Sequence, residues 1–427
     1  MSSPTSISDL DGLFKIVYGS QIINLMPEAS KVVRMIPFSQ EERIGKRFDQ
    51  PVALTYEHGF TYGAPGAGAF SLRASISMKM QNAEVDGYQG ILRAQMDYET
   101  AAKAVAGGAK AFKKATQLQV ENMMESGTKR IELACLYGQS GLGKTASSVN
   151  TDTTTTVLQI STASWATGIW SGMENCGLNF FAANGTIVSS GADAIFYIQS
   201  VDVDNRKLTV TGTITGITAL DIAAGSGALD IYFDTARTGA TSWNEMVGID
   251  KIITNTGILF NIDAATYNLW KGNTYSNSGA ALTLGKILSA IALPVGRGLN
   301  EKVVVLLNDR TWANVANDQA ALRKYDASYS SEEIKNGARA IRFYSQNGEI
   351  ELQPYNCIKE GESFVFPPKR LKRIGAQDIS FNSLGVEGRI FRELSDNAGF
   401  EYRLYTDQSI FCETPAKMMK ITSIVNS

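Results

Sequence analysis

The stretch ILRAQMDYETAAKAVAGGAKAFKKATQLQVENMMESGTKRIELACLYG, residues 91–138, decides the fold because it carries the longest helical pattern in the chain. Apolar or small residues recur along it at alternating steps of three and four, which places them on one side of a helix. They are Ile91, Ala94, Tyr98, Ala101, Val105, Gly108, Phe112 and Ala115, followed by Val120, Met123, Gly127, Ile131 and Ala134. Such a helix would be tens of Å long at ~1.5 Å per residue, so we expect the other segments to be organised around it.

Two adjacent glycines lie inside this pattern. Gly107 and Gly108 each cost about 1 kcal/mol relative to alanine in a helix interior, so we expect a bend or a break at this pair. The alternative is two ordinary helices joined there, because a globular helix averages only ~11 to 12 residues.

Upstream of the helix, a period-two pattern predicts a long β-hairpin. Apolar and polar residues alternate at both ends of the segment from Pro51 to Met80, and the tip EHGFTYGAPGAGAF is rich in Gly and Ala. A two-stranded ribbon is marginally stable alone, so it needs a surface to lie on, either a neighbouring subunit or the chain's own body. Residues 1–50 show no obvious core and predict an extended arm, with an edge strand as the alternative.

Downstream of the helix, three segments differ in pattern. Residues 147–261 are first rich in Thr and Ser and then carry short alternating runs separated by turns, which predicts a β-rich insertion. Residues 262–375 mix helical patterns with the apolar strand KVVVLLN, and residues 376–427 are strand-like. We therefore predict an α+β fold with parts at 1–50, 51–90, 91–146, 147–261, 262–375 and 376–427.

The charge balance argues against general nucleic-acid binding. Lys plus Arg number 40 against 42 Asp plus Glu, a net charge of -2, so no basic field attracts the whole molecule to DNA. Charged residues make up only 19% of the chain, below the roughly 25% of soluble proteins. This low charge suits a protein that buries much of its surface against copies of itself, and a low-charge monomer is the alternative.

The cysteines and the apolar segments indicate the cellular compartment in which the protein is made. Cys135, Cys176, Cys357 and Cys412 are scattered, which argues against a zinc site or a disulfide framework and predicts reduced thiols. The N-terminus lacks a basic start followed by an apolar core, and the most apolar segment, 287–295, is too short to span a bilayer. We expect a soluble protein made in a cytoplasm, with no membrane partner.

One motif matches a known nucleotide-binding pattern. GQSGLGKT places Gly138, Gly143, Lys144 and Thr145 in the P-loop pattern G-x-x-x-x-G-K-[ST]. In a true P-loop a strand leads into the glycine turn and a helix follows it, whereas here the long helix leads in and ASSVNTDTTTT follows. Nucleotide binding is therefore the minority hypothesis, and we expect no cofactor.

Other candidate sites are weak. His58 is the only histidine, so a catalytic triad could form only at the hairpin tip, and histidine-rich zinc sites are excluded. A carboxylate site for calcium or magnesium stays open. The paired acids and the basic run are expected to be solvated turns and charged surface; they are Asp202 with Asp204, Glu41 with Glu42, and Lys369, Arg370, Lys372 and Arg373. We predict that the protein is not an enzyme.

The order of these parts resembles the major capsid protein of tailed bacteriophages, which has the Hong-Kong-97-like fold. The resemblance covers essentially the whole chain, and the passages WNEMVGIDKIITNTGILFNID, VVLLNDRTWANV and GESFVFPPKRLKRIGAQD look similar too. It implies an N-arm, an extended E-loop hairpin and a spine helix in the P domain. A mixed A domain and the return strands of the P domain would follow, with the β-rich insertion between the spine helix and the A domain. GQSGLGKT would then be the glycine-rich turn after the spine.

The resemblance also implies partners. The chain would self-assemble into hexamers and pentamers of an icosahedral virion shell around double-stranded DNA, built in the host bacterial cytoplasm. A separate scaffolding protein is implied, because the chain has no room for a scaffolding segment before the arm; a portal and a decoration protein are further candidate partners. Some relatives join subunits through an E-loop lysine, but residues 57–70 contain no lysine and Lys79 lies back along the strand, so we expect no covalent cross-links between subunits.

Two rival functions remain at this stage. An encapsulin-like nanocompartment shell shares the fold and packages protein instead of DNA. A nucleotide-binding protein would use the glycine-rich GQSGLGKT turn.

Overall fold

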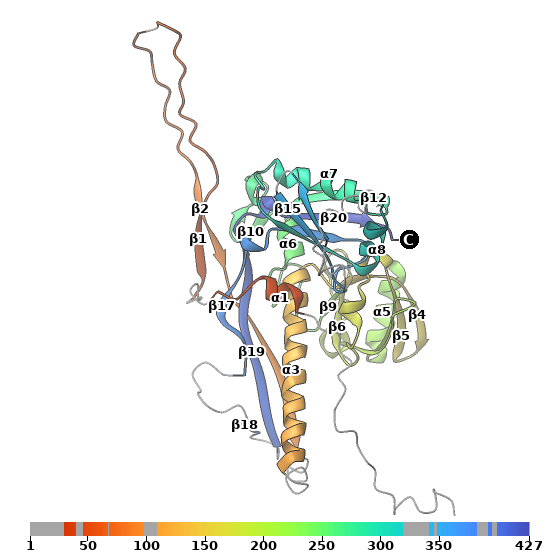
Figure 1. The fold of residues 1–427 in the computed structure, drawn as a ribbon. Helices are drawn as coiled ribbons and strands as arrows, with labels where there is room; N and C mark the ends of the chain where they lie inside the picture. Colours follow the sequence, from red (N-terminus) through yellow and green to blue (C-terminus); the bar gives the residue numbers. More distant parts are fainter. Residues whose placement is uncertain are drawn as a thin grey trace, which may run out of the picture.

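A computed structural model describes residues 30–39, 46–66, 68–97, 109–318, 341–345, 348–381, 392–394 and 399–426. Figure 1 shows one body built around a central helix, with a long hairpin projecting from it.

The central helix α3 spans Ala109–Tyr137, 29 residues. Its predicted beginning was wrong, because residues 91–97 belong to strand β3, Tyr88–Asp97. β3 pairs antiparallel with β19, Gly399–Cys412, from Tyr88 opposite Gln408 to Asp97 opposite Gly399. This continuous ladder outweighs the helical spacing, since tertiary pairing routinely overrides local preference. Gly107 and Gly108, where a bend was expected, lie outside the described residues.

The predicted hairpin is present, but its regular ladder is confined to the base. Strand β1, Phe48–Ala53, pairs with β2, Met80–Val85, in antiparallel register. Residues 54–79, which we call the hairpin extension, continue as two extended segments without a regular ladder and project far from the body (Figure 1). The second strand, predicted to end at Met80, instead begins there as β2.

A four-stranded sheet lies beside α3. It has the order β17-β19-β18, and β3 also pairs with β19. Met123 of α3 packs against Tyr402 and Leu404 of β19, which fixes the helix to the sheet. The other strands are β17 (Leu371–Ser380) and β18 (Arg392–Glu393).

The predicted β-rich insertion is a closed barrel with the order β4-β5-β8-β7-β6-β9. Helix α5, Ile214–Ser226, packs along β4 and β5, and the Thr213 side chain caps it by accepting the N–H of Gly216. The barrel begins at Gly143, inside the turn that was grouped with the helix. Its strands are β4 (Gly143–Asp152), β5 (Thr155–Ile160), β6 (Gly177–Phe181), β7 (Phe196–Asp202), β8 (Lys207–Thr211) and β9 (Asp230–Phe233).

A six-stranded inner sheet completes the body. Its order is β12-β20-β16-β13-β15-β14, and all five residues of β13 are buried, as the apolar run predicted. The C-terminal strand β20 lies in this sheet, so the C-terminal strands are divided between two sheets. The strands are β12 (Asn273–Ala280), β13 (Val303–Leu307), β14 (Ile341–Ser345), β15 (Gly348–Pro354), β16 (Ser363–Phe366) and β20 (Met419–Ile424).

Short elements connect these parts, and one core joins most of them. A single hydrophobic cluster contains Val32 of the arm, Leu136 of α3, Phe180 of the barrel and Val304 of the inner sheet. The barrel is therefore packed into the body. The remaining helices and short strands are α1 (Lys31–Met35), α4 (Thr167–Trp170), α6 (Ile249–Thr254), α7 (Leu284–Val295), α8 (Asp309–Asn317), β10 (Ile258–Leu259) and β11 (Ile262–Asp263).

Candidate assembly surface

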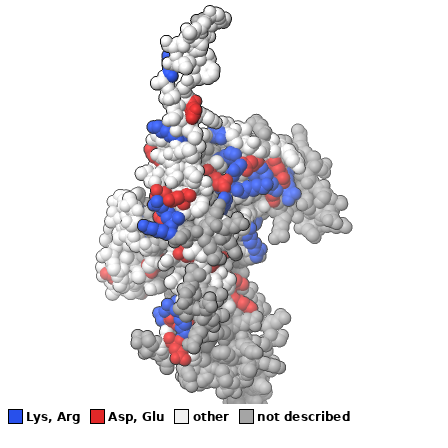
Figure 2. Space-filling view, turned by 90° about the vertical axis from the view of Figure 1, so that its left-hand side faces the viewer, with Lys and Arg blue, Asp and Glu red and all other residues white. Residues whose placement is uncertain are grey.

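The hairpin extension exposes many of its large apolar side chains to solvent. Every described side chain from Thr55 to Asn82 is exposed or only partly buried. Figure 2 shows the extension as a projection with few charged side chains. Its large apolar side chains have these exposed fractions: Tyr56 79%, Phe60 74%, Tyr62 88%, Phe70 47%, Leu72 78%, Ile76 57% and Met78 44%. Soluble monomers rarely expose apolar groups at such density, which marks an interaction surface.

Few hydrogen bonds hold the two sides of the extension together. The backbone N–H of Leu54 donates to the Lys79 carbonyl at 2.9 Å, and the N–H of His58 donates to the Ile76 carbonyl at 3.0 Å. Near the tip, the Arg73 N–H donates to the Thr61 hydroxyl at 3.1 Å. A ribbon held this loosely gains little from folding on its own.

The base of the hairpin, in contrast, is firmly attached. The Glu84 carboxylate pairs with Arg47 at 2.6 Å and accepts a hydrogen bond from the Asn261 amide at 2.8 Å. Ala83 and Val85 are buried in the main core. The body therefore holds the extension at a defined position and leaves its apolar side chains free.

The N-terminal arm is bound to the central helix by a buried carboxylate. Glu132 of α3 accepts the N–H groups of Val32 and Val33 at 2.6 and 2.8 Å, and the Tyr355 hydroxyl at 2.6 Å. Burial raises the pKa of Glu132, and these three hydrogen bonds act against the rise. Val32 and Ile36 of the arm are fully buried. Arm, helix and inner sheet thus meet at one carboxyl group.

The P-loop candidates lie where α3 meets the barrel. Gly138 directly follows α3, and its N–H donates to the Ala134 carbonyl at 2.9 Å. Gly143 and Lys144 open β4, and the buried Thr145 hydroxyl accepts the N–H of Leu229 at 2.9 Å. A helix leads into this turn and a strand leaves it, which is the reverse of a P-loop.

The groups that would bind phosphate already have partners in the chain. Lys144 pairs with Asp230 at 3.2 Å. A Cβ at Gly138 would overlap the Met246 carbonyl, so this glycine is needed for close packing. Three N–H groups of the turn donate within the chain: Gln139 to Glu245 at 2.9 Å, Leu142 to Ile231 at 2.8 Å and Thr145 to Leu229 at 3.0 Å. The geometry therefore gives the nucleotide hypothesis no support.

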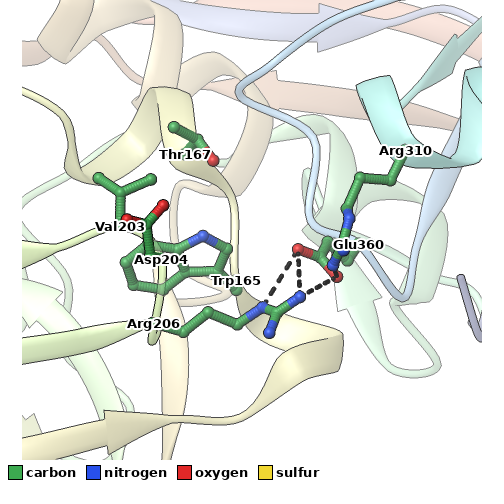
Figure 3. A pocket seen from close by; sticks show the side chains of 7 residues that line it. All are labelled: Trp165, Thr167, Val203, Asp204, Arg206, Arg310 and Glu360. Atoms are coloured by element: carbon green, nitrogen blue, oxygen red, sulfur yellow. Dashed lines mark hydrogen bonds and ion pairs between the residues drawn. The ribbon is translucent and has the colours of Figure 1, made fainter. Parts of the chain in front are cut away.

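A small polar pocket lies between the barrel and the inner sheet (Figure 3). It encloses about 200 Å³ and is lined by Trp165, Thr167, Val203, Asp204, Arg206, Arg310 and Glu360. The buried Glu360 carboxylate pairs with Arg206 at 3.1 Å and with Arg310 at 3.4 Å. Because Arg206 follows barrel strand β7 and Arg310 lies on α8, this ion triplet joins the two parts.

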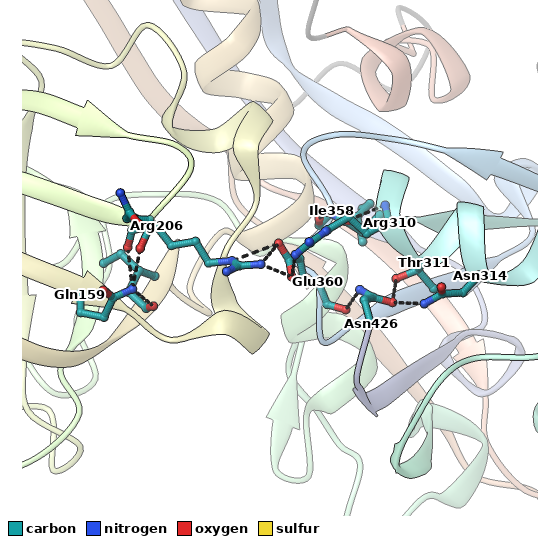
Figure 4. Close-up of polar contacts among 11 residues, drawn as sticks. Gln159, Arg206, Arg310, Thr311, Asn314, Ile358, Glu360 and Asn426 are labelled. Atoms are coloured by element: carbon teal, nitrogen blue, oxygen red, sulfur yellow. Dashed lines mark hydrogen bonds and ion pairs between the residues drawn. The ribbon is translucent and has the colours of Figure 1, made fainter.

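The contacts continue to the C-terminus (Figure 4). Asn426 donates to the Glu360 carbonyl at 3.1 Å and accepts from Thr311 at 3.0 Å and from Asn314 at 3.2 Å. This chain of hydrogen bonds fixes the barrel relative to the inner sheet.

The remaining sequence candidates are dispersed. His58 lies on the exposed hairpin, Asp202 accepts the Asn205 N–H in a surface turn, and Glu41 and Glu42 lie outside the described residues. No group of three or more metal-ligating side chains occurs within the described part of the chain. The four cysteines are free thiols.

Several side chains of the predicted basic run form ion pairs with acidic residues. Arg370 pairs with Glu301 at 2.7 Å, and Lys372 pairs with Glu413 at 3.2 Å. Arg373, expected at the surface, is buried and pairs with Asp378 at 2.9 Å.

Comparison with known proteins identifies the fold. Neither a protein-family model nor a curated protein matches the sequence. Solved structures do match over nearly the full chain, and they show the Hong-Kong-97-like phage capsid fold, so the predicted α+β capsid fold is confirmed.

Two of these structures are similar enough to compare. The capsid asymmetric unit of cyanophage A-1(L) gives a TM-score of 0.54 at 10% identity, covering 97% of this chain and 98% of that chain. The capsid of a native GTA particle gives a TM-score of 0.51 at 7% identity, covering 99% of this chain and 100% of that chain. Within the described residues, no helix is both long and apolar enough to cross a membrane.

Proposed function

We propose that this chain is the major capsid protein of a tailed bacteriophage. In this proposal it assembles into hexamers and pentamers of an icosahedral head that encloses double-stranded DNA, and it turns over no substrate. The observation that carries the proposal is the hairpin extension, which presents seven large apolar side chains to solvent on a fold shared with phage capsids. Permanent assemblies bury thousands of Å² at their interfaces, and a neighbouring copy is the surface that would cover these side chains.

The proposal includes the setting of assembly. The shell forms in the host bacterial cytoplasm and becomes the virion capsid, with a separate scaffolding protein, a portal and a decoration protein as partners. The hairpin tip, residues 57–70, contains no lysine, which supports a shell held together without covalent links between subunits.

Assembly can be tested with a hairpin variant. A chain carrying Tyr56→Ser, Phe60→Ser and Tyr62→Ser should stay folded and lose shell formation in negative-stain electron microscopy, whereas the natural chain forms particles of uniform size. A matched control with Ile214→Ser, Ile222→Ser and Ile258→Ser removes three similarly exposed apolar side chains elsewhere, at 61%, 67% and 75% exposure. The control should still form shells. Shells formed equally well by the hairpin variant would contradict the proposal.

The contents of the particles separate the capsid from a nanocompartment. Particles from a producing cell lysate should hold nuclease-protected double-stranded DNA. Particles that consistently hold protein cargo and no DNA would favour the encapsulin-like function.

Lys144→Ala separates the capsid from a nucleotide-binding protein. Lys144 is mostly exposed and forms one surface ion pair, which contributes at most about 1 kcal/mol to stability. We expect the variant to assemble as the natural chain does. Binding of ATP or GTP by the natural chain, lost in this variant, would instead support the nucleotide hypothesis.

A further inference from the structure

A buried lysine lies between two carboxylates where the inner sheet meets the end of the central helix. Lys420 Nζ, on β20, is 2.7 Å from Asp250 Oδ1 and 2.8 Å from Glu362 Oε1. The side chains of Lys420, Asp250 and Glu362 are only 7%, 8% and 21% exposed. Asp250 lies on α6, 170 positions before the lysine.

The surroundings of this triad are largely buried and partly aromatic. The Phe364 ring centre lies 5.6 Å from Lys420 Nζ. A second buried ammonium group, that of Lys359, lies 4.0 Å over the Tyr137 ring and donates to the Gly141 carbonyl at 2.9 Å. Burial lowers the pKa of Lys359, and the charges of Glu362 and Asp250 oppose this change.

One oxygen of the triad has no partner. Glu362 Oε2 is buried and accepts no hydrogen bond within the described part of the chain. A buried polar oxygen without a partner is costly. Oε2 of Glu362 is therefore an open acceptor position next to Lys420, whose Nζ lies 2.8 Å from the other oxygen of the same carboxyl group.

We propose that Lys420 and Asp250 are joined by an intramolecular amide bond, with Glu362 as the proton carrier. Lys420 Nζ passes one proton by way of Glu362 to the Asp250 carboxylate, and the resulting amine attacks Cγ of the neutral carboxyl group. The Nζ–Cγ bond forms as one Cγ–O bond breaks, and the leaving oxygen departs as water with the protons released from Nζ. An ammonium and a carboxylate thus become one neutral amide and one water molecule, with no oxidant or reductant.

Proximity and the loss of two buried charges favour this step. Nζ is already at hydrogen-bond distance from the Asp250 carboxylate, and holding two reacting groups at such distances removes much of the entropic barrier. Burial lowers the pKa of Lys420, but the charges of Glu362 and Asp250 raise it by more, so the reaction starts from an ion pair. Forming the amide removes two charges from a site where their desolvation is expensive.

A second lysine in the same fold provides an internal comparison. Lys302 also contacts two carboxylates, Glu349 at 3.1 Å and Glu351 at 2.6 Å, but its side chain is 42% exposed. Solvent stabilises its charge and competes with attack on the carboxyl carbon, so this site should remain an ion pair.

The link would brace each subunit internally. It closes a loop between α6, which follows the barrel, and the last strand of the inner sheet. Because both ends belong to one chain, the bond differs from a link between subunits and requires no assembly.

Mass spectrometry of the purified full-length chain tests the proposal without any variant. The intact mass should fall below the sequence mass by one water molecule. After trypsin digestion, the peptide 238–251 should be recovered joined to 418–427, and Lys302 should occur only in unlinked peptides. A full sequence mass after prolonged incubation, in both free chain and particles, would overturn the proposal.

Two variants locate the chemistry. Lys420→Arg keeps a cation between the carboxylates but lacks the reactive amine, so it should show the full sequence mass; a missing water in this variant would place the link elsewhere. Glu362→Gln keeps the shape and removes the proton carrier, so linking should slow at least tenfold in a time course of intact mass. An unchanged rate would overturn the role given to Glu362.

Discussion

At the scale of single residues, Glu245 holds a turn of unusual backbone conformation. It lies where the chain returns from the barrel to the end of the central helix, and it holds Gln139 twice: its carboxylate accepts the Gln139 N–H at 2.9 Å, and its carbonyl accepts the Gln139 amide at 3.0 Å. Gln139 has a φ of 62°, the left-handed region that non-glycine residues rarely adopt. Glu245 therefore helps to maintain a strained turn.

This position predicts a pH-dependent stability. Burial raises the pKa of Glu245 to about 7, against the lowering effects of the Gln139 N–H and of Arg130. A raised pKa means that the folded state favours the protonated form, so the contribution to stability is full below the ordinary pKa and is lost as pH rises through about 7. Between pH 5 and 8 we expect the free energy of unfolding to fall by roughly 1 to 3 kcal/mol relative to Glu245→Gln.

Denaturant unfolding at several pH values measures this difference. Glu174→Gln, at an exposed position, should keep the pH slope of the natural chain. A Glu245→Gln variant with the natural slope would show that Glu245 does not titrate in this range.

Residue roles at this junction could be predicted only in part. The sequence singled out Gly138 and Lys144, and both lie at the turn that ends the central helix, where a glycine-rich turn was expected. The reason for the glycine, the Met246 carbonyl packed against it, lies more than a hundred residues away. No local pattern reports such a contact, so the motif located the turn and could not explain why it needs its glycine.

At the scale of elements, local patterns predicted the presence of helices and strands better than they predicted the boundaries of these elements. The hairpin, the β-rich insertion and the buried strand β13 followed from periodicity. Residues 91–97 did not, because their spacing fits a helix while their partner, β19, lies more than 300 residues further along the chain. A helical pattern in one segment carries no information about a distant strand that competes for it.

The contact between the N-terminal arm and the central helix can be tested as an element. Replacing Glu132 with Ala leaves the N–H groups of Val32 and Val33 and the Tyr355 hydroxyl buried without their acceptor, which costs about 1 to 3 kcal/mol for each unmet group. We expect the arm to detach before the body unfolds. Trypsin should then cut after Lys31 and Arg34 at least tenfold faster than in the natural chain.

Two further variants serve as comparisons for the Glu132→Ala experiment. Glu132→Gln keeps one acceptor oxygen and should show an intermediate rate. Glu125→Ala, at an exposed position on the same helix, should leave the rate unchanged. Equal cleavage in Glu132→Ala and the natural chain would mean that the arm is held by its apolar contacts alone.

At the scale of the whole molecule, two regions differ in what stabilises them. The body shares one core from the arm to the inner sheet, and it is further joined through Glu360 and Asn426. Apart from Leu54 at its base, the hairpin extension has no buried side chain among its described residues. The body therefore has its own core, whereas under the proposed function the extension gains its apolar contacts from a neighbouring copy.

This division predicts how a protease would attack the protein. In the unassembled chain, chymotrypsin should cut first at Phe60, Tyr62 and Phe70, because these side chains are exposed on a ribbon with few hydrogen bonds. The body should remain as stable fragments, since its aromatic side chains are mostly buried. In assembled shells the same sites should be cut at least tenfold more slowly, because burial against a neighbouring subunit removes both exposure and local opening. Microscopy of the digested sample should show intact particles throughout. A hairpin that resists cleavage in the monomer, or is cut equally fast in the shell, would show that it does not take part in subunit contact.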